Sequence, residues 1–183
     1  MKLIVAMILM VFAGCRHATS EQQYINYIND PEHKITQQIK IGDVQATVKW
    51  LPAGYRKLKS EKLEEPAAAE EGEGFYFFDV KFDKTKGEKP VAGKLAYLDF
   101  DIQKDFVLLK GKDSLLPLIC QKIENGIGGS YQYMLVFEKQ EEELTKDFAV
   151  VYNDKVFGTG TLAFVYNQED ISKIPKLKSE ESK

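Results

Sequence analysis

Short segments in which apolar and polar residues alternate run through most of this sequence, and they favour folds built from β-strands. The clearest is the segment 44–50, VQATVKW, in which every second residue is apolar. The same period of two recurs at 76–82, 131–137, 148–152 and 162–166. Because side chains two residues apart share one face of a strand, each segment predicts a strand with one buried face. No long helical pattern separates them, so the chain is expected to be a mostly β, antiparallel sandwich of roughly eight or nine strands.

A short helix is expected ahead of the first strand. Ser20 and Gln23 have the spacing of a capping box, and an apolar cluster with helical spacing follows them. Asp30-Pro31 ends that pattern, so the helix is placed at residues 21–29. Farther along, Gly42-Asp43 lies between two alternating segments and predicts a two-residue hairpin turn of type II′.

Three less regular segments complete the expected architecture. Residues 97–102 carry an apolar side chain at every second position and predict a further strand. Residues 115–123 are mostly apolar but contain Pro117, which cannot donate a backbone hydrogen bond, so an edge or bulged strand is expected there. Residues 59–74 are acidic and nearly free of large apolar side chains, and they predict a solvated loop.

The N-terminal residues have the features of an export signal. Met1-Lys2 supplies positive charge, Leu3–Phe12 is an uninterrupted apolar run, and the small pair Ala13-Gly14 directly precedes Cys15. Ten apolar residues are too few for a transmembrane helix, which needs about 20, but they suit the apolar part of a signal peptide. Phe12-Ala13-Gly14-Cys15 resembles the lipobox of bacterial lipoproteins, with Phe at a position where Leu is commoner.

The lipobox resemblance implies cleavage before Cys15, a diacylglycerol on its sulfur and a fatty acid such as palmitate on its new amino group. The protein would then be held on a lipid membrane of the bacterial cell envelope, facing either the periplasm or the cell surface. In that family, an aspartate directly after the cysteine is the retention signal. Arg16 occupies this position here, which favours sorting to the outer membrane. The alternative is an ordinary cleaved signal with a chance cysteine. The expected organisation is a signal peptide at 1–14, a tether at 15–20, one domain at 21–177 and a polar tail at 178–183.

The order of the aromatic segments carries a second resemblance. Trp50, the strand 76–82 and the later segments YQYMLVFE at 131–138 and DFAVVYND at 147–154 follow one another along the chain. This order resembles the immunoglobulin-like, telokin-like domains of unknown function that many bacterial lipoproteins carry. The resemblance covers about residues 35–167. It implies an immunoglobulin-like antiparallel β-sandwich and brings no catalytic residues with it.

Charge and cysteine content exclude several classes of protein. The chain has 25 Lys and Arg against 28 Asp and Glu, a net charge of −3, and no basic cluster, so no nucleic-acid partner is expected. Cys120 lies in an apolar stretch, far in sequence from His17 and His33, and is expected to be a buried core residue rather than a nucleophile. The sequence contains neither a His-x-x-x-His nor a Cys-x-x-Cys pair, so no metal or other cofactor is expected.

The candidate functional residues are few. Cys15 is the expected lipidation site, and Tyr97, Asp99 and Asp101 form a weak ligand-site candidate on one strand face. The expected function is a non-enzymatic binding or interaction module with an envelope protein or a glycan as partner. Its ligand would meet a loop, at 59–74, 83–90, 111–114 or 125–130. The alternative is a carboxylate-based envelope hydrolase, acting on glycans through Asp99, Asp101 and Asp105.

Overall fold

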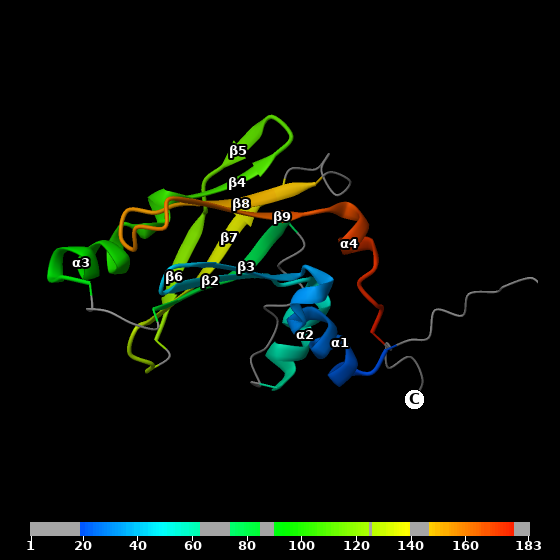
Figure 1. Cartoon of the computed structure of the whole chain (residues 1–183). Coiled ribbons are helices and arrows are strands. Elements are labelled where there is room, and N and C mark those ends of the chain that lie inside the picture. The colour runs from blue at the N-terminus through cyan, green and yellow to red at the C-terminus, as the bar shows by residue number, and fades with distance from the viewer. Residues whose placement is uncertain (1–18, 63–73, 85–89, 125, 140–146, 178–183) are drawn as a thin grey trace, which may run out of the picture.

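The fold is known from a computed structural model, which describes residues 19–62, 74–84, 90–124, 126–139 and 147–177 (Figure 1). Cys15, residues 63–73 and the tail 178–183 therefore lie outside the described residues. The helical segments are α1 Glu21–Asn29, η1 Pro31–His33, α2 Ala53–Lys62, α3 Ala92–Phe100, η2 Ile102–Asp105 and α4 Gln168–Ser172. The strands are β1 Thr36–Ile41, β2 Val44–Trp50, β3 Phe75–Lys84, β4 Phe106–Lys110, β5 Asp113–Leu115, β6 Ile119–Ile123, β7 Ser130–Glu138, β8 Phe148–Asn153 and β9 Thr161–Tyr166.

The strands form two antiparallel sheets, which confirms the prediction of a mostly β, antiparallel protein. The order is β1-β2-β3-β7-β6 in the five-stranded sheet and β5-β4-β8-β9 in the four-stranded sheet. The inner faces of the two sheets share one aromatic core. Phe78 and Phe82 of β3 contact rings of the other sheet, with centroids 5.7 Å from Tyr166 and 4.7 Å from Tyr152. Burial of these large rings is the main source of stability for such a core.

The strongest local signals in the sequence are confirmed. α1 spans the predicted residues 21–29, and Ser20 and Gln23 form both hydrogen bonds of the capping box. β1 and β2 pair so that only Gly42-Asp43 separates them. Gly42 has φ +59°, and Asp43 does not have a positive φ, as a type II′ turn requires.

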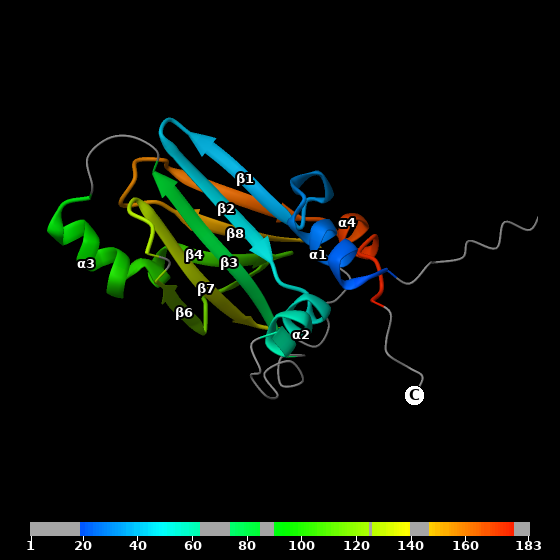
Figure 2. The same ribbon diagram turned by 90° about the horizontal axis from the view of Figure 1, so that it is seen from below.

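A second, smaller core lies outside the five-stranded sheet. α1 and α2 cover one end of its outer face, where they pack on Phe77 and Met134 (Figure 2). Trp50 contacts both cores and so connects them. α2 includes residues 59–62, so the prediction that the loop 59–74 begins at Lys59 is wrong. Tyr55 and Leu58 lie three residues apart in the sequence, so they share one face of α2. Both are buried in this core, as the helical spacing requires.

The two ends of the described chain meet beside α1. Thr19 forms a parallel bridge with Leu177, and the Thr19 backbone N–H donates to the Lys176 carbonyl at 3.0 Å. Leu177 and Ile174 pack against the smaller core, so the folded part of the described chain reaches Leu177. α1 and α4 lie together at one end of the molecule, and α3 lies at the opposite end (Figures 1 and 2).

The strand predicted at 97–102 is wrong, because this segment contains the end of α3 and the start of η2. Leu98 and Ile102 are both buried, and their spacing of four places them on one face of a helical segment. Phe100, which a strand would have buried with them, is 78% exposed. The apolar residues here therefore follow a helical spacing, and their alternation does not reflect a strand with one buried face.

The edge strand expected at 115–123 is confirmed only for residues 119–123, which form β6. β5 ends at Leu115 at the edge of one sheet, and β6 begins at Ile119 at the edge of the other. Pro117 lies in the connection between them, where no ladder hydrogen bond is needed from it. Among the described residues, none of the helices is long and apolar enough to cross a bilayer.

Candidate functional site

The three residues of the predicted ligand site do not converge. Tyr97 and Asp99 lie on α3 and Asp101 directly follows it, rather than on a strand face. Asp99 accepts a hydrogen bond at 2.7 Å from Lys122 of β6, whereas Asp101 pairs with Lys104. Each carboxylate is thus neutralised by a different lysine.

Tyr97 takes part in a separate cluster around a buried carboxylate. Asp105 is only 1% exposed, and its Oδ1 accepts hydrogen bonds from Lys155 Nζ at 2.6 Å and from the Tyr97 hydroxyl at 2.9 Å. Asp105 Oδ2 is buried without a hydrogen-bond partner in the part of the chain that the structure describes. These contacts raise the pKa of Lys155, chiefly through its hydrogen bond to Asp105, and burial raises the pKa of Tyr97.

The cluster does not have the arrangement that a pair of hydrolytic carboxylates needs. Such a pair must face a common open space, with one member able to release a proton and the other ionised. Asp105 is buried beneath Lys155 and Tyr97, and Asp99 and Asp101 bind different lysines. Stabilisation of a buried charge is the chemistry that this arrangement supports best.

Replacing Lys155 with methionine is expected to destabilise the fold, because it leaves Asp105 as an uncompensated buried charge. We expect the thermal unfolding midpoint to fall by several degrees at neutral pH. The matched control is Lys104→Met, which removes the lysine from the exposed Asp101 and should leave the midpoint nearly unchanged. Because the pKa of Lys155 is raised, its side chain stays positively charged at neutral pH. Its contribution to the stability of the fold is therefore complete at neutral pH and is lost only at strongly alkaline pH. Equal midpoints for both variants would contradict this role of Lys155.

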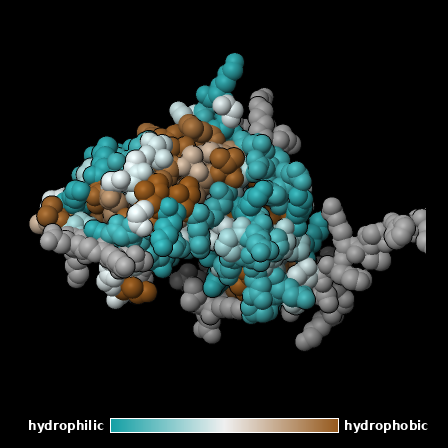
Figure 3. Space-filling view, viewed as in Figure 1, coloured by the Kyte–Doolittle hydropathy of each residue, from teal (hydrophilic) through white to brown (hydrophobic). Residues whose placement is uncertain are grey.

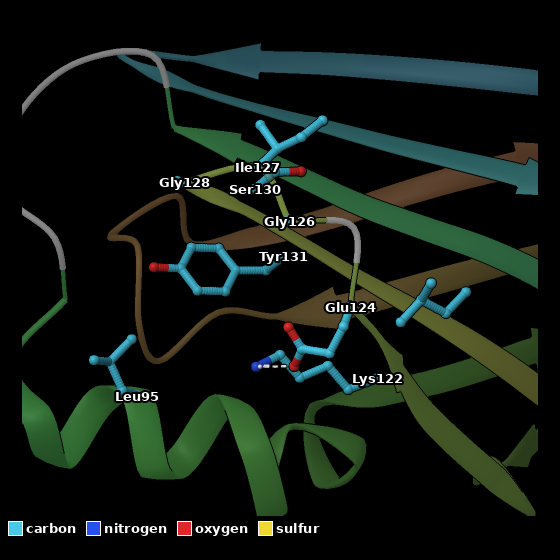
Figure 4. Close-up of a pocket in the computed structure, with 10 residues that line it drawn as sticks. Leu95, Lys122, Glu124, Gly126, Ile127, Gly128, Ser130 and Tyr131 are labelled. Carbon is cyan, nitrogen blue, oxygen red and sulfur yellow. Dashed lines mark ion pairs between the residues drawn. The ribbon is translucent and has the colours of Figure 1, made fainter.

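A surface pocket of about 320 Å³ lies between α3 and the loop that joins β6 to β7 (Figure 4). Leu95 of α3, the end of β6, the glycine loop 126–129 and Tyr131 of β7 line it. Figure 4 shows the Tyr131 ring, Leu95 and the Lys122–Glu124 pair bordering the same space. The sequence had named the loop 125–130 as a place for a ligand but not the residues that complete the pocket; Asn125 lies outside the described residues.

The glycine loop is fixed in place by its backbone. Gly126 and Gly129 have φ +69° and +81°, values that favour glycine. The Gly129 carbonyl accepts a hydrogen bond from the Lys84 N–H at 2.8 Å. A Cβ at Gly129 would lie 3.0 Å from the Lys84 carbonyl oxygen, so a side chain here would force the loop away from β3.

The charges in this pocket are already largely paired. Lys122 bonds to Asp99 at 2.7 Å and to Glu124 at 3.0 Å, and the hydrogen bond to Asp99 is the main reason that its pKa is raised. Burial raises the pKa of Tyr131, whose hydroxyl therefore stays protonated and able to donate. Peptide groups, a phenol and an apolar Leu95 together suit a small uncharged ligand with hydroxyl groups. No group of three or more metal-ligating side chains occurs among the described residues.

Cys120 behaves as a core residue. Its side chain is partly buried and packs against the main core, and burial raises its thiol pKa to about 11 from 9.0. His33 lies in η1. Its ring stacks on that of Tyr27 with the ring centroids 3.7 Å apart, and its Nδ1 is 3.0 Å from the Tyr27 carbonyl oxygen. His17 lies outside the described residues. A cysteine with a raised pKa is a poor nucleophile at neutral pH.

Alkylation of Cys120 by iodoacetamide at pH 8 is expected to be about 100-fold slower in the folded protein than in guanidinium chloride, because only the thiolate reacts. The measurement uses the Cys15→Ala chain, in which Cys120 is the single cysteine. The denatured chain serves as the control, since its thiol has the ordinary pKa. Similar rates in both states would mean that Cys120 is an accessible, reactive thiol.

Comparisons with known proteins do not place the chain in an enzyme family. No protein-family model matches it, and no curated protein matches it. Among solved structures, it is similar to a protein of unknown function from Burkholderia pseudomallei K96243, with a TM-score of 0.44 and 10% sequence identity. The match covers 84% of this chain and 88% of that one.

Proposed function

We propose that this protein is a lipid-anchored module of the bacterial cell envelope that binds a partner without catalysing a reaction. One observation carries the proposal: an apolar leader ends in Ala13-Gly14-Cys15, only a few residues before the described fold begins at Thr19. Acyl chains on Cys15 would hold the domain close to the membrane through a tether of a few residues. Arg16 after the cysteine favours the outer membrane.

The arrangement of the fold supports a binding role. Thr19 precedes α1 at one end of the molecule, whereas α3 and the neighbouring pocket lie at the opposite end (Figures 1 and 2). A domain held at Cys15 can therefore direct the pocket away from the bilayer. Loops at the end of a rigid β scaffold commonly form binding sites. An envelope protein or a glycan is the proposed class of partner, and the mixed polar and apolar pocket suits the hydroxyl groups of a glycan.

We further propose that the two sheets have the immunoglobulin-like arrangement. The strand order supports this: β2-β3-β7-β6 corresponds to A-B-E-D of an immunoglobulin domain, and β5-β4-β8-β9 corresponds to C′-C-F-G. β1 then extends the first sheet at its edge. In this arrangement the outer face of β4, β8 and β9 corresponds to the face of the C-F-G sheet.

Metabolic labelling with radioactive palmitate tests the anchor. Bacteria that produce the wild-type chain are labelled and divided into membrane and soluble fractions. The expected result is a labelled protein in the membrane fraction, shorter than the precursor by the leader. An unlabelled protein in the soluble fraction would overturn the proposal and leave an ordinary secreted domain.

A further inference from the structure

The start of α3 is weakly held to the rest of the molecule. Every residue from Val91, the N-cap, to Ala96 is exposed, and the first buried residue of the segment is Leu98. Figure 3 shows hydrophobic side chains on the surface at the end of the molecule where α3 lies in Figure 1. A segment with few buried apolar contacts is the kind that opens independently of the core. We call residues 91–96 the gate.

The sequence of the gate stabilises a helix poorly. Val91 forms no side-chain hydrogen bond at the N-cap, and the first turn contains Gly93 and no acidic residue. A missing cap and a glycine each make a helix less stable. α3 has only nine residues, and isolated helices shorter than about 12 residues are marginal in water. The gate therefore depends on its contacts with the rest of the protein.

α1 provides the comparison within the same protein, because it also has nine residues. Its N-terminus forms a complete capping box, and Glu21 places a negative charge in its first turn. Three of its residues are buried in the smaller core, namely Tyr24, Ile25 and Ile28. Any difference in stability between the starts of the two helices thus follows from capping and burial rather than from length.

Among the described residues, a single side-chain hydrogen bond fastens the gate to the sandwich. Lys94 Nζ donates to the Val156 carbonyl, in the loop between β8 and β9, at 2.6 Å. The rest of α3 is held more firmly, because Leu98 is buried in the main core and its carbonyl accepts a hydrogen bond at 3.0 Å from the buried Tyr133 hydroxyl. The gate can therefore detach while Leu98 keeps the core closed.

We propose that the gate detaches from the sandwich and docks again while Leu98 stays buried, and that this motion opens and closes the pocket. Leu95 belongs to the gate and forms the α3 wall of the pocket, across the space from Tyr131 (Figure 4). Departure of the gate removes this wall and gives access to the pocket from that side. Asp99 lies beyond Leu98, so its ion pair with Lys122 persists in the open state.

Amide hydrogen exchange of the full Cys15→Ala chain, measured residue by residue by NMR, tests the gate. The Leu95 N–H donates to the Val91 carbonyl at 3.0 Å, and the Tyr24 N–H donates to the Ser20 carbonyl at 2.9 Å, so the two amides occupy the same position in α3 and α1. After correction for intrinsic rates, Leu95 is expected to exchange at least tenfold faster than Tyr24. Equal protection of the two amides would overturn the proposal.

The same spectra distinguish a gate from unfolding of the whole helix. The Asp101 N–H donates to the Tyr97 carbonyl at 2.9 Å, beyond the gate. It is expected to exchange at least tenfold more slowly than the Leu95 amide, because Leu98 keeps this part of α3 docked. Equal exchange at Leu95 and Asp101 would mean that α3 opens as one unit, and it would overturn a gate that ends before Leu98.

Gly93→Ala is expected to slow the exchange of the Leu95 amide about threefold, because alanine stabilises the docked helix. A Cβ at Gly93 would meet no atom within 4 Å, so the substitution fits the fold. The matched control is Gly74→Ala, at a position that is equally open but outside every helix, and it should leave the Leu95 rate unchanged. An unchanged Leu95 rate in Gly93→Ala would contradict the proposal.

Lys94→Met is expected to speed the exchange of the Leu95 amide about fivefold, because it removes the hydrogen bond to the Val156 carbonyl. Methionine and lysine have similar helix propensities, so the helix itself should be little affected. The matched control is Lys112→Met, at an exposed residue between β4 and β5, which should not alter the Leu95 rate. Equal Leu95 rates in the two variants would show that Lys94 does not hold the gate.

Failure of the gate and failure of the proposed function are distinguishable. The role of the gate in admitting a ligand rests on the proposed binding function, whereas its opening does not, and the exchange experiment uses a chain that lacks Cys15. Rapid Leu95 exchange together with an unlabelled wild-type protein would overturn the lipid anchor and support the gate. A palmitate-labelled wild-type protein together with equal protection of Leu95 and Tyr24 would overturn the gate and leave the anchor intact.

Discussion

Replacing Cys15 with alanine is expected to move the protein from the membrane fraction into the soluble fraction and to abolish its palmitate labelling. Each methylene group that enters the bilayer contributes about 0.8 kcal/mol, and a single acyl chain binds only marginally. Two or three chains on Cys15 therefore account for almost all of the expected membrane affinity. Among the described residues, no helix could replace them by crossing the bilayer.

Cys120→Ala is the matched control for this experiment. It removes the only other cysteine, and that residue packs against the main core. The variant should keep both the palmitate label and the membrane location of the wild type. Membrane association of the Cys15→Ala protein would contradict the anchor. Loss of the palmitate label in Cys120→Ala would mean that Cys120, and not Cys15, carries the lipid.

Replacing Phe78 with alanine is expected to lower the free energy of unfolding by about 3–5 kcal/mol, the usual cost of a buried phenylalanine. Phe78 is fully buried between the sheets. Its ring centroid lies 5.9 Å from that of Phe137 and 5.7 Å from that of Tyr166, so the truncation leaves a cavity that borders both sheets. Urea unfolding followed by circular dichroism measures the change.

Phe100→Ala makes the same chemical change at a residue that is 78% exposed. Its effect on the free energy of unfolding should stay within about 0.5 kcal/mol, as for most surface substitutions. The contrast between the two variants separates the contribution of the shared core from a general effect of losing an aromatic ring. Equal losses would mean that burying the Phe78 ring between the sheets contributes no more to stability than the exposed ring of Phe100.

The sequence predicted best where short-range chemistry determines the structure. The capping box at Ser20 fixes the start of α1, and Gly42-Asp43 fixes the β1–β2 hairpin through backbone conformation alone. The alternating segments became strands because each has one apolar face to bury. None of these inferences depends on residues that are distant in the chain.

The prediction failed around Tyr97, where two periods fit the same apolar residues. Leu98, Phe100 and Ile102 fit a strand, whereas Leu98 and Ile102 alone fit a helix. The choice depends on what the segment packs against, because Leu98 and Ile102 reach the core between the sheets. That information lies in the tertiary fold and outside the local sequence.

The pocket and the outer face of the four-stranded sheet were only partly predictable. The glycine loop is visible in the sequence, but Leu95 lies about thirty residues away and reaches the pocket only through the position of α3. In β4 and β8, the run FVLL at 106–109 and the run FAVV at 148–151 are apolar on both strand faces. Such a run indicates burial on both sides, whereas Leu109 is 42% exposed in the part of the chain that the structure describes.

If the proposed anchor holds the chain at Cys15, the bridge between Thr19 and Leu177 has a mechanical consequence. Drag on the domain, or a pull by a bound partner, reaches the tether through Thr19. Because Thr19 is hydrogen-bonded to Lys176 and Leu177 is packed in the smaller core, the load is shared between the two ends of the folded chain. To peel α1 away from the N-terminal side, a pull at the tether must first break this joint.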